Sequence, residues 1–381
     1  MALPRSKYVR EGQEGVYHCF SRCVRRAFLC GFDPLTGRDF SHRKEWLVDR
    51  LRYLAAIFAV EVCAYAAMIN HYHTILRLRP DIVASWSDWE VATRWLKLFP
   101  PRRRPGSKPT PATEEEIRAL TQCPARIAKL RKRLCSLSWF MGRLNEFIAR
   151  AANKEDDVKG RFWESRFKCQ ALLDDAAIAA CMVYVDLNLI RAGLAASPEE
   201  SDFISIQERI RAWQKETAAA AVKAKADQEI DSTTSPGNVR LPEEIEEVVH
   251  SIPESIPSTE DSPQGAVLSS LWLCPIASDS HRRGILQMTA EEYFDLVDRS
   301  GRLTRSDKRG AIDPDLAPIL LRIGANPDAW ADTVSGFGTK FRLAAGLLSS
   351  LRHFADQIGR RWLNGFTAAR IAFVSSPPHW V

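Results

Sequence analysis

The sequence lacks the features that mark secreted, disulfide-bonded and membrane proteins. Its nine cysteines include no Cys-X-X-Cys pair and match no common zinc-site spacing, so we expect free thiols, most of them in the core. The N-terminal residues contain no apolar core of the kind found in secretory signals. The longest apolar run, Leu54 to Ile69, is short and is interrupted by Glu61. We therefore expect a cytoplasmic protein with no membrane partner.

The chain also lacks internal repeats, and one stretch lacks aromatic residues. Residues 227–265 contain none, and residues 226–265 carry ten acids against the single base Arg240. This composition is typical of a disordered linker. At 381 residues the chain exceeds one ordinary domain. We predict a first domain at 1–214, an acidic disordered linker at 215–265 and a helical C-terminal region of unknown role at 266–381.

The first domain opens with alternating strand and helix patterns. Residues 15–22, 60–67 and 71–79 are predicted strands, and a helix is predicted at 42–58. Strand, helix and two further strands form the opening of a ferredoxin-like sheet. We therefore predict an α+β fold with a ferredoxin-like (RRM-like) antiparallel sheet, its helices and the helical C-terminal region.

Cap residues and apolar spacing predict the elements that follow. The expected strand, at 160–170, is rich in aromatic and basic residues. The expected helices run from a cap at Ser85 to Phe99, from a Thr113–Glu116 capping box to Gln122, from Pro124 to about Ala152, from Asp175 to Ala192, and from Ser201 to Trp213.

The charge of the chain is unevenly distributed. The net charge is only +6, but residues 101–170 carry 17 Lys and Arg against 8 Asp and Glu. A basic block of this kind suggests a polyanionic partner, although a solvated helix face is the simpler interpretation of any one residue. The candidates for contacts to a nucleic-acid backbone are Arg102, Arg103, Arg104, Lys129, Arg131, Lys132, Arg133, Arg161 and Arg166. Trp163 is a candidate for stacking on a base, with core packing as the alternative.

Two histidines flank one large residue on the third predicted strand. Side chains alternate faces along a strand, so His71 and His73 project from one side and Tyr72 from the other. Two adjacent imidazoles supply half of a divalent-metal site. A lone His-X-His pair is more often an ordinary surface and core pair, so the motif needs a second signal. His18, on the first strand, is a further imidazole, with an ordinary strand residue as the simpler interpretation.

The second signal lies in the helix predicted after Asp175. Tyr184 and Asn188 are four residues apart and therefore share one helix face. The amide oxygen of Asn188 could be a third metal ligand, and the phenol of Tyr184 a nucleophile beside a phosphate. A phenol has a pKa of about 10 and needs a nearby cation to favour its phenolate. Taken singly, Tyr184 and Asn188 are more simply explained as packing and helix-end residues.

Together these motifs resemble those of the single-tyrosine HUH transposases, and most of all the repeat-associated tyrosine transposases. The segment HYH at 71–73 resembles the family's His-hydrophobic-His motif, and YVDLN at 184–188 resembles its tyrosine motif. The similarity covers roughly residues 10–210. Two departures are Leu189 and Ile69, where relatives usually or often have proline. Tyr72 is a third, because it places a second phenol near the metal.

The resemblance implies a transposase domain at 1–214 with Tyr184 as nucleophile and His71, His73 and Asn188 as ligands of Mg²⁺ or Mn²⁺. It implies cleavage and rejoining of single-stranded hairpin DNA through a 5′-phosphotyrosine, and it leaves a homodimer open. Two alternatives stand beside it. One is a metallohydrolase of the amidohydrolase type, which needs further histidines and an aspartate on later barrel strands. The other is a non-catalytic or domesticated nucleic-acid-binding protein on the same fold.

Overall fold

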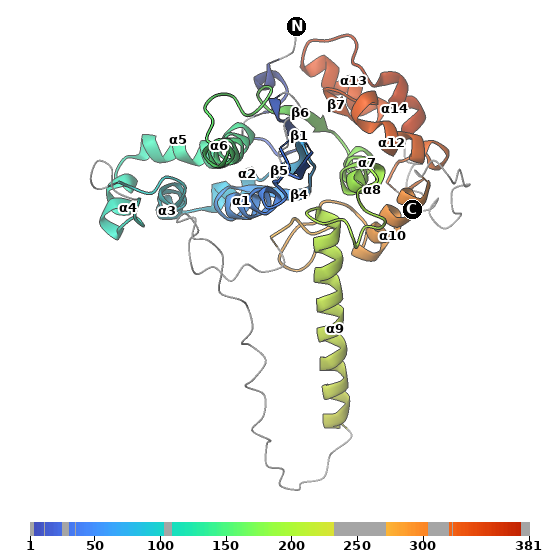
Figure 1. Ribbon diagram of the computed structural model, residues 1–381, viewed down its shortest axis with the longest axis horizontal. Coiled ribbons are helices and arrows are strands. Elements are labelled where there is room, and N and C mark those ends of the chain that lie inside the picture. The colour runs from blue at the N-terminus through green and yellow to red at the C-terminus, as the bar shows by residue number, and fades with distance from the viewer. Residues whose placement is uncertain are drawn as a thin grey trace.

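A five-stranded sheet organises the computed structural model of the chain (Figure 1). The structure describes residues 4–10, 12–24, 30–34, 36–102, 109–231, 272–303, 320–321 and 323–374, without the side chains of 221, 223–231 and 303. The strand order is β4-β5-β1-β6-β7. The strands are β1 (Gly15–Arg22), β4 (Val60–Ala67), β5 (His71–Leu78), β6 (Lys168–Leu172) and β7 (Ala344–Ala345), and a separate hairpin holds β2 (Phe32–Asp33) and β3 (Arg38–Asp39).

Sheet neighbours are antiparallel except for β6 and β7, which are parallel. The chain therefore has the mixed α+β architecture that the sequence predicted. The antiparallel pairing also argues against the amidohydrolase alternative, because a barrel of that type is built from parallel strands. The first three predicted strands agree with β1, β4 and β5 to within one residue.

Helices cover both faces of the sheet (Figure 1). On one face lie α1 and α6, which pack on each other, and α3 and α5 lie beyond them. On the other face lies α7, covered in turn by α10 and α12 of the C-terminal region. The helices of the first half are α1 (Arg43–Ile57), α2 (Pro80–Ser85), α3 (Asp88–Leu98), α4 (Glu114–Thr121), α5 (Pro124–Leu134), α6 (Leu137–Glu155), α7 (Asp175–Asp186) and α8 (Asn188–Arg191).

The remaining elements belong to α9 and the C-terminal region. The long helix α9 projects away from the sheet (Figure 1). The elements are α9 (Ser205–Asp231), α10 (Ala290–Leu303), α12 (Trp330–Lys340), α13 (Leu348–Gln357) and α14 (Phe366–Ala372), with short 3₁₀ turns η1 (Arg5–Lys7) and η3 (Pro327–Ala329). None of the helices in the described ranges is both long and apolar enough to span a bilayer.

Helix α7 explains why the C-terminal region packs on the first domain. Its residues Ala176 to Val183 are all buried, so the helix is apolar around its whole circumference. Such a helix needs cover on every side, and a sheet covers only one. The other sides are covered by α10 and α12. Asp174 caps the helix by accepting from the Ala177 N–H, and it also accepts from the Leu347 N–H beside β7.

Five predicted elements differ from the structure. The helix predicted at 124–152 breaks at Cys135 and Ser136, which lets α5 pack on α3 and α6 on α1. The cap predicted at Ser85 is instead Ser87, because Pro80 starts the short helix α2. Only the end of the strand predicted at 160–170 belongs to a strand, β6. Trp163 instead forms an isolated β-bridge with Cys23.

The other two corrections concern α7 and α9. The helix predicted at 175–192 ends at Asp186, and a separate short helix, α8, begins at Asn188. The linker predicted from residue 215 is wrong in its first part, because α9 continues to Asp231. The rest of the predicted linker lies outside the described residues. The capping box of Thr113 and Glu116 is confirmed.

Candidate active site

The two histidines of β5 share the sheet face that α7 covers. The ring centroids of His71 and His73 lie 5.0 Å apart, and that of Tyr184 on α7 lies 5.8 Å from His73. Tyr72 points to the other face, where its O–H donates to Asn145 Oδ1 at 2.6 Å. Its ring meets Trp163 edge-on at 5.5 Å, and the residue is fully buried. The strand alternation is confirmed, and Tyr72 is a packing residue of the opposite face.

Each of the two imidazoles uses Nδ1 for a hydrogen bond inside the protein. His71 Nδ1 lies 2.7 Å from Asn70 Oδ1, and His73 Nδ1 lies 2.8 Å from His18 Nε2. Within the described part of the chain, no hydrogen bond engages Nε2 of either ring. These two nitrogens are therefore the atoms that remain for a ligand.

Burial keeps both imidazoles uncharged at neutral pH. Burial, together with the smaller effect of the nearby Arg22 guanidinium, lowers the pKa of His71 to about 4. Burial also lowers the pKa of His73 well below its ordinary value, with the His18 and His71 rings acting in the same direction. A neutral imidazole keeps a lone pair, which is the form that binds metal ions.

Tyr184 lies near the end of α7, half-buried between the imidazoles and α12. Its ring lies edge-on to His18 and His73 and 6.0 Å from the ring of Phe337. Burial raises the pKa of the Tyr184 phenol, and the guanidinium of Arg191, 4.9 Å from the ring centroid, opposes that rise. Arg191 also donates to the Ser335 carbonyl at 2.5 Å. Sequence reasoning missed Arg191, although its spacing of seven residues from Tyr184 is close to two helical turns.

Asn188 follows a break in the helix at Leu187. Its amide nitrogen donates to the Val185 carbonyl at 3.3 Å, and its Oδ1 has no hydrogen-bond partner in the described ranges. The break follows Asp186, the last residue of α7. Its buried carboxylate accepts from Ser205 Oγ and from Tyr293 Oη, each at 2.5 Å. Tyr184 and Asn188 thus lie on two consecutive helices rather than on one.

The donor set suits a cation that accepts both nitrogen and oxygen ligands. His71 Nε2, His73 Nε2 and Asn188 Oδ1 are the uncommitted atoms, and two imidazoles with one amide oxygen do not demand zinc. Among the described residues, no group of three or more His, Cys, Asp or Glu side chains is arranged to hold a metal ion. A site here would therefore depend on Asn188 or on ligands from solvent or substrate.

The predicted DNA contacts on α5 lie away from these histidines. Helix α5 is on the opposite side of the sheet from α7 (Figure 1). Lys129 and Lys132 are exposed there. Arg131 is committed to the Val83 and Trp86 carbonyls and to Asp88, and Arg133 stacks on Trp139.

The other candidates have varied positions. Arg102 is exposed, and Arg103 and Arg104 lie outside the described residues. Arg161 is exposed beside Glu164. Trp163 is a core residue, since its ring is buried and its Nε1–H donates to the Asn145 carbonyl.

A small basic pocket adjoins the histidines. It has a volume of about 120 Å³ and is lined by Phe20, Ser21, Arg22, Glu164, Ser165, Arg166 and Lys168. Arg22 is the register partner of His71, and Phe20 is the partner of His73. Of its basic residues, sequence reasoning named only Arg166. Arg22 could have been found from the pairing of β1 with β5, which places it directly opposite the first histidine.

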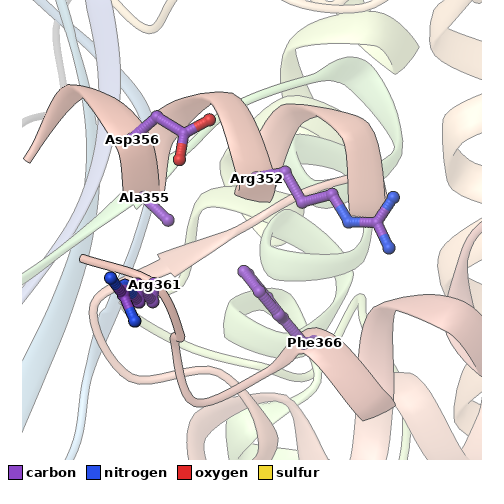
Figure 2. A pocket seen from close by; sticks show the side chains of 5 residues that line it. All are labelled: Arg352, Ala355, Asp356, Arg361 and Phe366. Carbon is purple, nitrogen blue, oxygen red and sulfur yellow. The ribbon is translucent and has the colours of Figure 1, made fainter. Parts of the chain in front are cut away.

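A larger pocket lies in the C-terminal region, apart from these residues. Its volume is about 330 Å³. Figure 2 shows Arg352 and Asp356 on α13 facing Arg361 and Phe366 across it. It contains none of the predicted site residues.

No known family model matches the chain, and no curated protein matches it. One solved structure is similar, described as "Structure of the REP associates tyrosine transposase bound to a REP hairpin". The two chains are 12% identical, and the similarity covers 55% of this chain and 86% of that chain with a TM-score of 0.31. A likeness of this size establishes neither family nor function.

Proposed function

We propose that the protein is a metal-dependent transposase of the single-tyrosine HUH type, acting on single-stranded hairpin DNA. The observation that carries the proposal is the meeting of His71, His73 and Tyr184 on one face of the sheet. Two neutral imidazoles keep Nε2 uncommitted, and the Tyr184 ring lies 5.8 Å from that of His73. The sequence motifs for the ligand pair and for the nucleophile thus come from segments about 110 residues apart and lie close together in space.

The strand order supports the fold that this proposal needs. Each of the strands β4-β5-β1-β6 is antiparallel to its neighbours, and α1 and α6 cover one face. Numbered in chain order, these strands read 2-3-1-4, the order expected of a ferredoxin-like βαββαβ core. Helix α7 would then be an addition that delivers the nucleophile to the open face.

In the proposed reaction, Tyr184 Oη attacks a phosphodiester phosphorus as its phenolic proton leaves. A P–O(Tyr) bond forms and the bond from phosphorus to O3′ breaks, which leaves a 5′-phosphotyrosine and a 3′-hydroxyl that takes up a proton. Attack by another 3′-hydroxyl reverses the step, so rejoining needs no external energy source. Arg191 favours the phenolate by its charge.

The cofactor in this proposal is Mg²⁺ or Mn²⁺. His71 Nε2, His73 Nε2 and Asn188 Oδ1 would hold it, and when bound it would offset negative charge on the phosphate. Burial prepares the histidines for this role by keeping their lone pairs free at neutral pH.

The DNA backbone would run along the basic pocket beside β1. Arg22, Arg166 and Lys168 line it, and all three side chains are exposed. Phosphate contacts from such residues supply affinity without sequence preference. The pocket adjoins the register partners of both histidines, so a strand bound there passes close to Tyr184.

A second candidate function is nucleic-acid binding without catalysis. The observation that favours it is the cover on Tyr184, whose ring packs against Phe337 and whose phenol has a raised pKa. A nucleophile that stays covered and protonated would not react. The two candidates differ in whether a covalent product forms.

The deciding experiment incubates the protein with labelled hairpin-containing single strands and Mn²⁺ or Mg²⁺, followed by denaturing gels. We expect a covalent adduct in the wild type and in Tyr72→Phe, and none in Tyr184→Phe. Tyr72→Phe is the matched control because Tyr72 belongs to the same motif but faces away from the imidazoles. An adduct in Tyr184→Phe would refute the nucleophile. Binding of DNA without an adduct under either metal would establish the non-catalytic function.

A further inference from the structure

Three polar side chains form a buried row across the centre of the sheet. His18 on β1 is the register partner of Gln170 on β6, and Phe20, two residues along β1, is the partner of His73 on β5. His18, Phe20 and His73 therefore share a face, and His18 reaches His73 diagonally. The exposed fractions of Gln170, His18 and His73 are 3%, 2% and 5%. Polar groups this deeply buried need partners, and here they are one another's partners.

The hydrogen bonds of the row have a defined direction. Gln170 Oε1 lies 3.3 Å from His18 Nδ1, and an amide oxygen can only accept, so His18 Nδ1 carries the proton. A neutral imidazole has one donor and one acceptor, so His18 Nε2 accepts. His73 Nδ1, 2.8 Å from that nitrogen, must then be the donor. The proton of His73 is thereby assigned to Nδ1 and the lone pair to Nε2.

We infer that Gln170 and His18 are positioning residues that hold His73 in the Nδ1–H tautomer and so reserve its Nε2 for a metal ion. The inference rests on the proposed function only for the identity of the ligand. Histidine ligands of metals commonly donate their second N–H to an acceptor, which fixes the ring and its tautomer. In this chain the acceptor is His18 on β1. Gln170, on the neighbouring strand β6, in turn fixes the tautomer of His18.

The orientation of the Gln170 amide sets every proton in the row. The Gln170 Nε2 has no hydrogen-bond partner among the described residues. If the amide were reversed, Nε2 would donate to His18 Nδ1, every proton in the row would shift, and His73 Nε2 would carry a hydrogen that blocks metal binding. The tautomer of His73 thus shows in which direction the hydrogen bonds of the row run.

The test measures that tautomer in the full-length, metal-free protein without DNA. Two-bond ¹H–¹⁵N correlation spectra of histidine-labelled protein at pH 7.5 distinguish the tautomers, and loss of signals in His73→Ala assigns the ring. We expect the Nδ1–H form in the wild type and in Gln170→Glu, which keeps an accepting oxygen. We expect Gln170→Leu to show a mixture of both forms. The Nε2–H form in the wild type would overturn the inference.

A second measurement concerns the ion itself. Titration of the DNA-free proteins with Mn²⁺ should show an affinity about 10 to 100 times weaker in Gln170→Leu than in the wild type, and little change in Gln170→Glu. An unchanged tautomer and unchanged affinity in Gln170→Leu would refute the role of Gln170. The wild-type spectrum needs no variant, so the inference stays testable if Gln170→Leu does not fold. Because neither readout needs DNA or an adduct, their failure is distinguishable from failure of the transposase proposal.

Discussion

The two halves of the candidate site are held in different ways. The imidazole half lies on central strands, and among the described residues the hydrogen-bond partners of its rings are His18 on β1, linked in turn to Gln170 on β6, and Asn70 in the turn before β5. The tyrosine half lies at the end of α7 and depends on distant residues. Phe337 packs on the Tyr184 ring, Ser335 accepts from Arg191, and Tyr293 donates to Asp186.

This difference separates the control of the two chemical roles. The imidazole half is complete within the first 172 residues, because Gln170 on β6 is the last residue of its hydrogen-bonded row. The tyrosine half, with Asn188 just after α7, is completed by α10 and α12, which come after residue 271 in the chain. Changes in the C-terminal region should therefore alter the reactivity of Tyr184 while leaving the two imidazoles in place.

The largest effect is expected from the imidazoles. His71→Ala and His73→Ala should each lower metal-dependent cleavage by at least about 100-fold, because they remove donors for an ion worth several kcal/mol to the reaction. DNA binding, measured by fluorescence anisotropy, should persist. The matched control is His281→Ala, which changes an exposed histidine far along the chain. Unchanged cleavage in the two strand variants would exclude the metal site.

The next effect concerns the hydrogen bond by which Tyr293 of α10 joins Asp186 of α7. Burial raises the pKa of Asp186 from 3.8 to about 6, so the folded state holds its proton more tightly than the unfolded state. The stability from this group is complete below pH 3.8 and is lost as the pH rises through 6. This rise in pKa corresponds to about 3 kcal/mol in the free energy of unfolding.

Urea denaturation of the wild type and Asp186→Asn checks this pH dependence. Relative to the variant, the wild type should lose about 3 kcal/mol between pH 3.8 and pH 7. Asp356→Asn, an exposed carboxylate in the same protein, serves as the control. A constant difference between the wild type and Asp186→Asn across this range would contradict the prediction.

A smaller effect tests the packing of α12 on the nucleophile. A Cβ atom at Gly338 would lie 3.0 Å from Tyr184 Oη, so Gly338→Ala should displace the phenol by a few tenths of an ångström. We expect adduct formation to slow about tenfold, since small misplacements of reacting groups are costly. Manganese affinity should not change.

The control for this experiment is Gly336→Ala on the same helix. Its Cβ would meet only the flexible side chain of Lys340, which can swing aside. Adduct formation in this variant should match the wild type. Equal rates in both alanine variants would show that α12 does not set the position of Tyr184.

The smallest effect concerns the DNA backbone. Arg22→Gln and Arg166→Gln should each reduce the slope of log affinity against log salt by about 0.7 for single-stranded DNA, because each removes one phosphate contact. Lys129→Gln and Lys132→Gln, on the far side of the sheet, should leave the slope unchanged. Binding isotherms over a range of salt concentrations measure both. If only the α5 variants changed the slope, the DNA would instead run along the α5 side of the sheet.

Local patterns in the sequence predicted the imidazole half well. Strands β1, β4 and β5 follow from β-branched and apolar residues between turns, and alternation alone places Tyr72 opposite the two histidines. The capping boundary at Asp174 is also a local signal. These features depend on residues close in sequence, which is why they could be predicted.

The tyrosine half could not be predicted in the same way. The helix break at Leu187 accompanies hydrogen bonds of Asp186 to Ser205 and Tyr293, which are 19 and 107 residues away. Phe337 reaches Tyr184 only because α12 packs on α7, and no periodicity in either helix predicts that pairing. The row from Gln170 to His73 likewise requires the register of three strands.

The parallel pairing of β7 with β6 has a consequence for synthesis of the chain. The strand β6 ends at Leu172, but Ala344 and Ala345 of β7 pair with it only after roughly 170 more residues have been made. At ordinary translation rates this interval lasts roughly 10 to 30 seconds. Throughout it, the nascent sheet has an open edge that can pair with other chains.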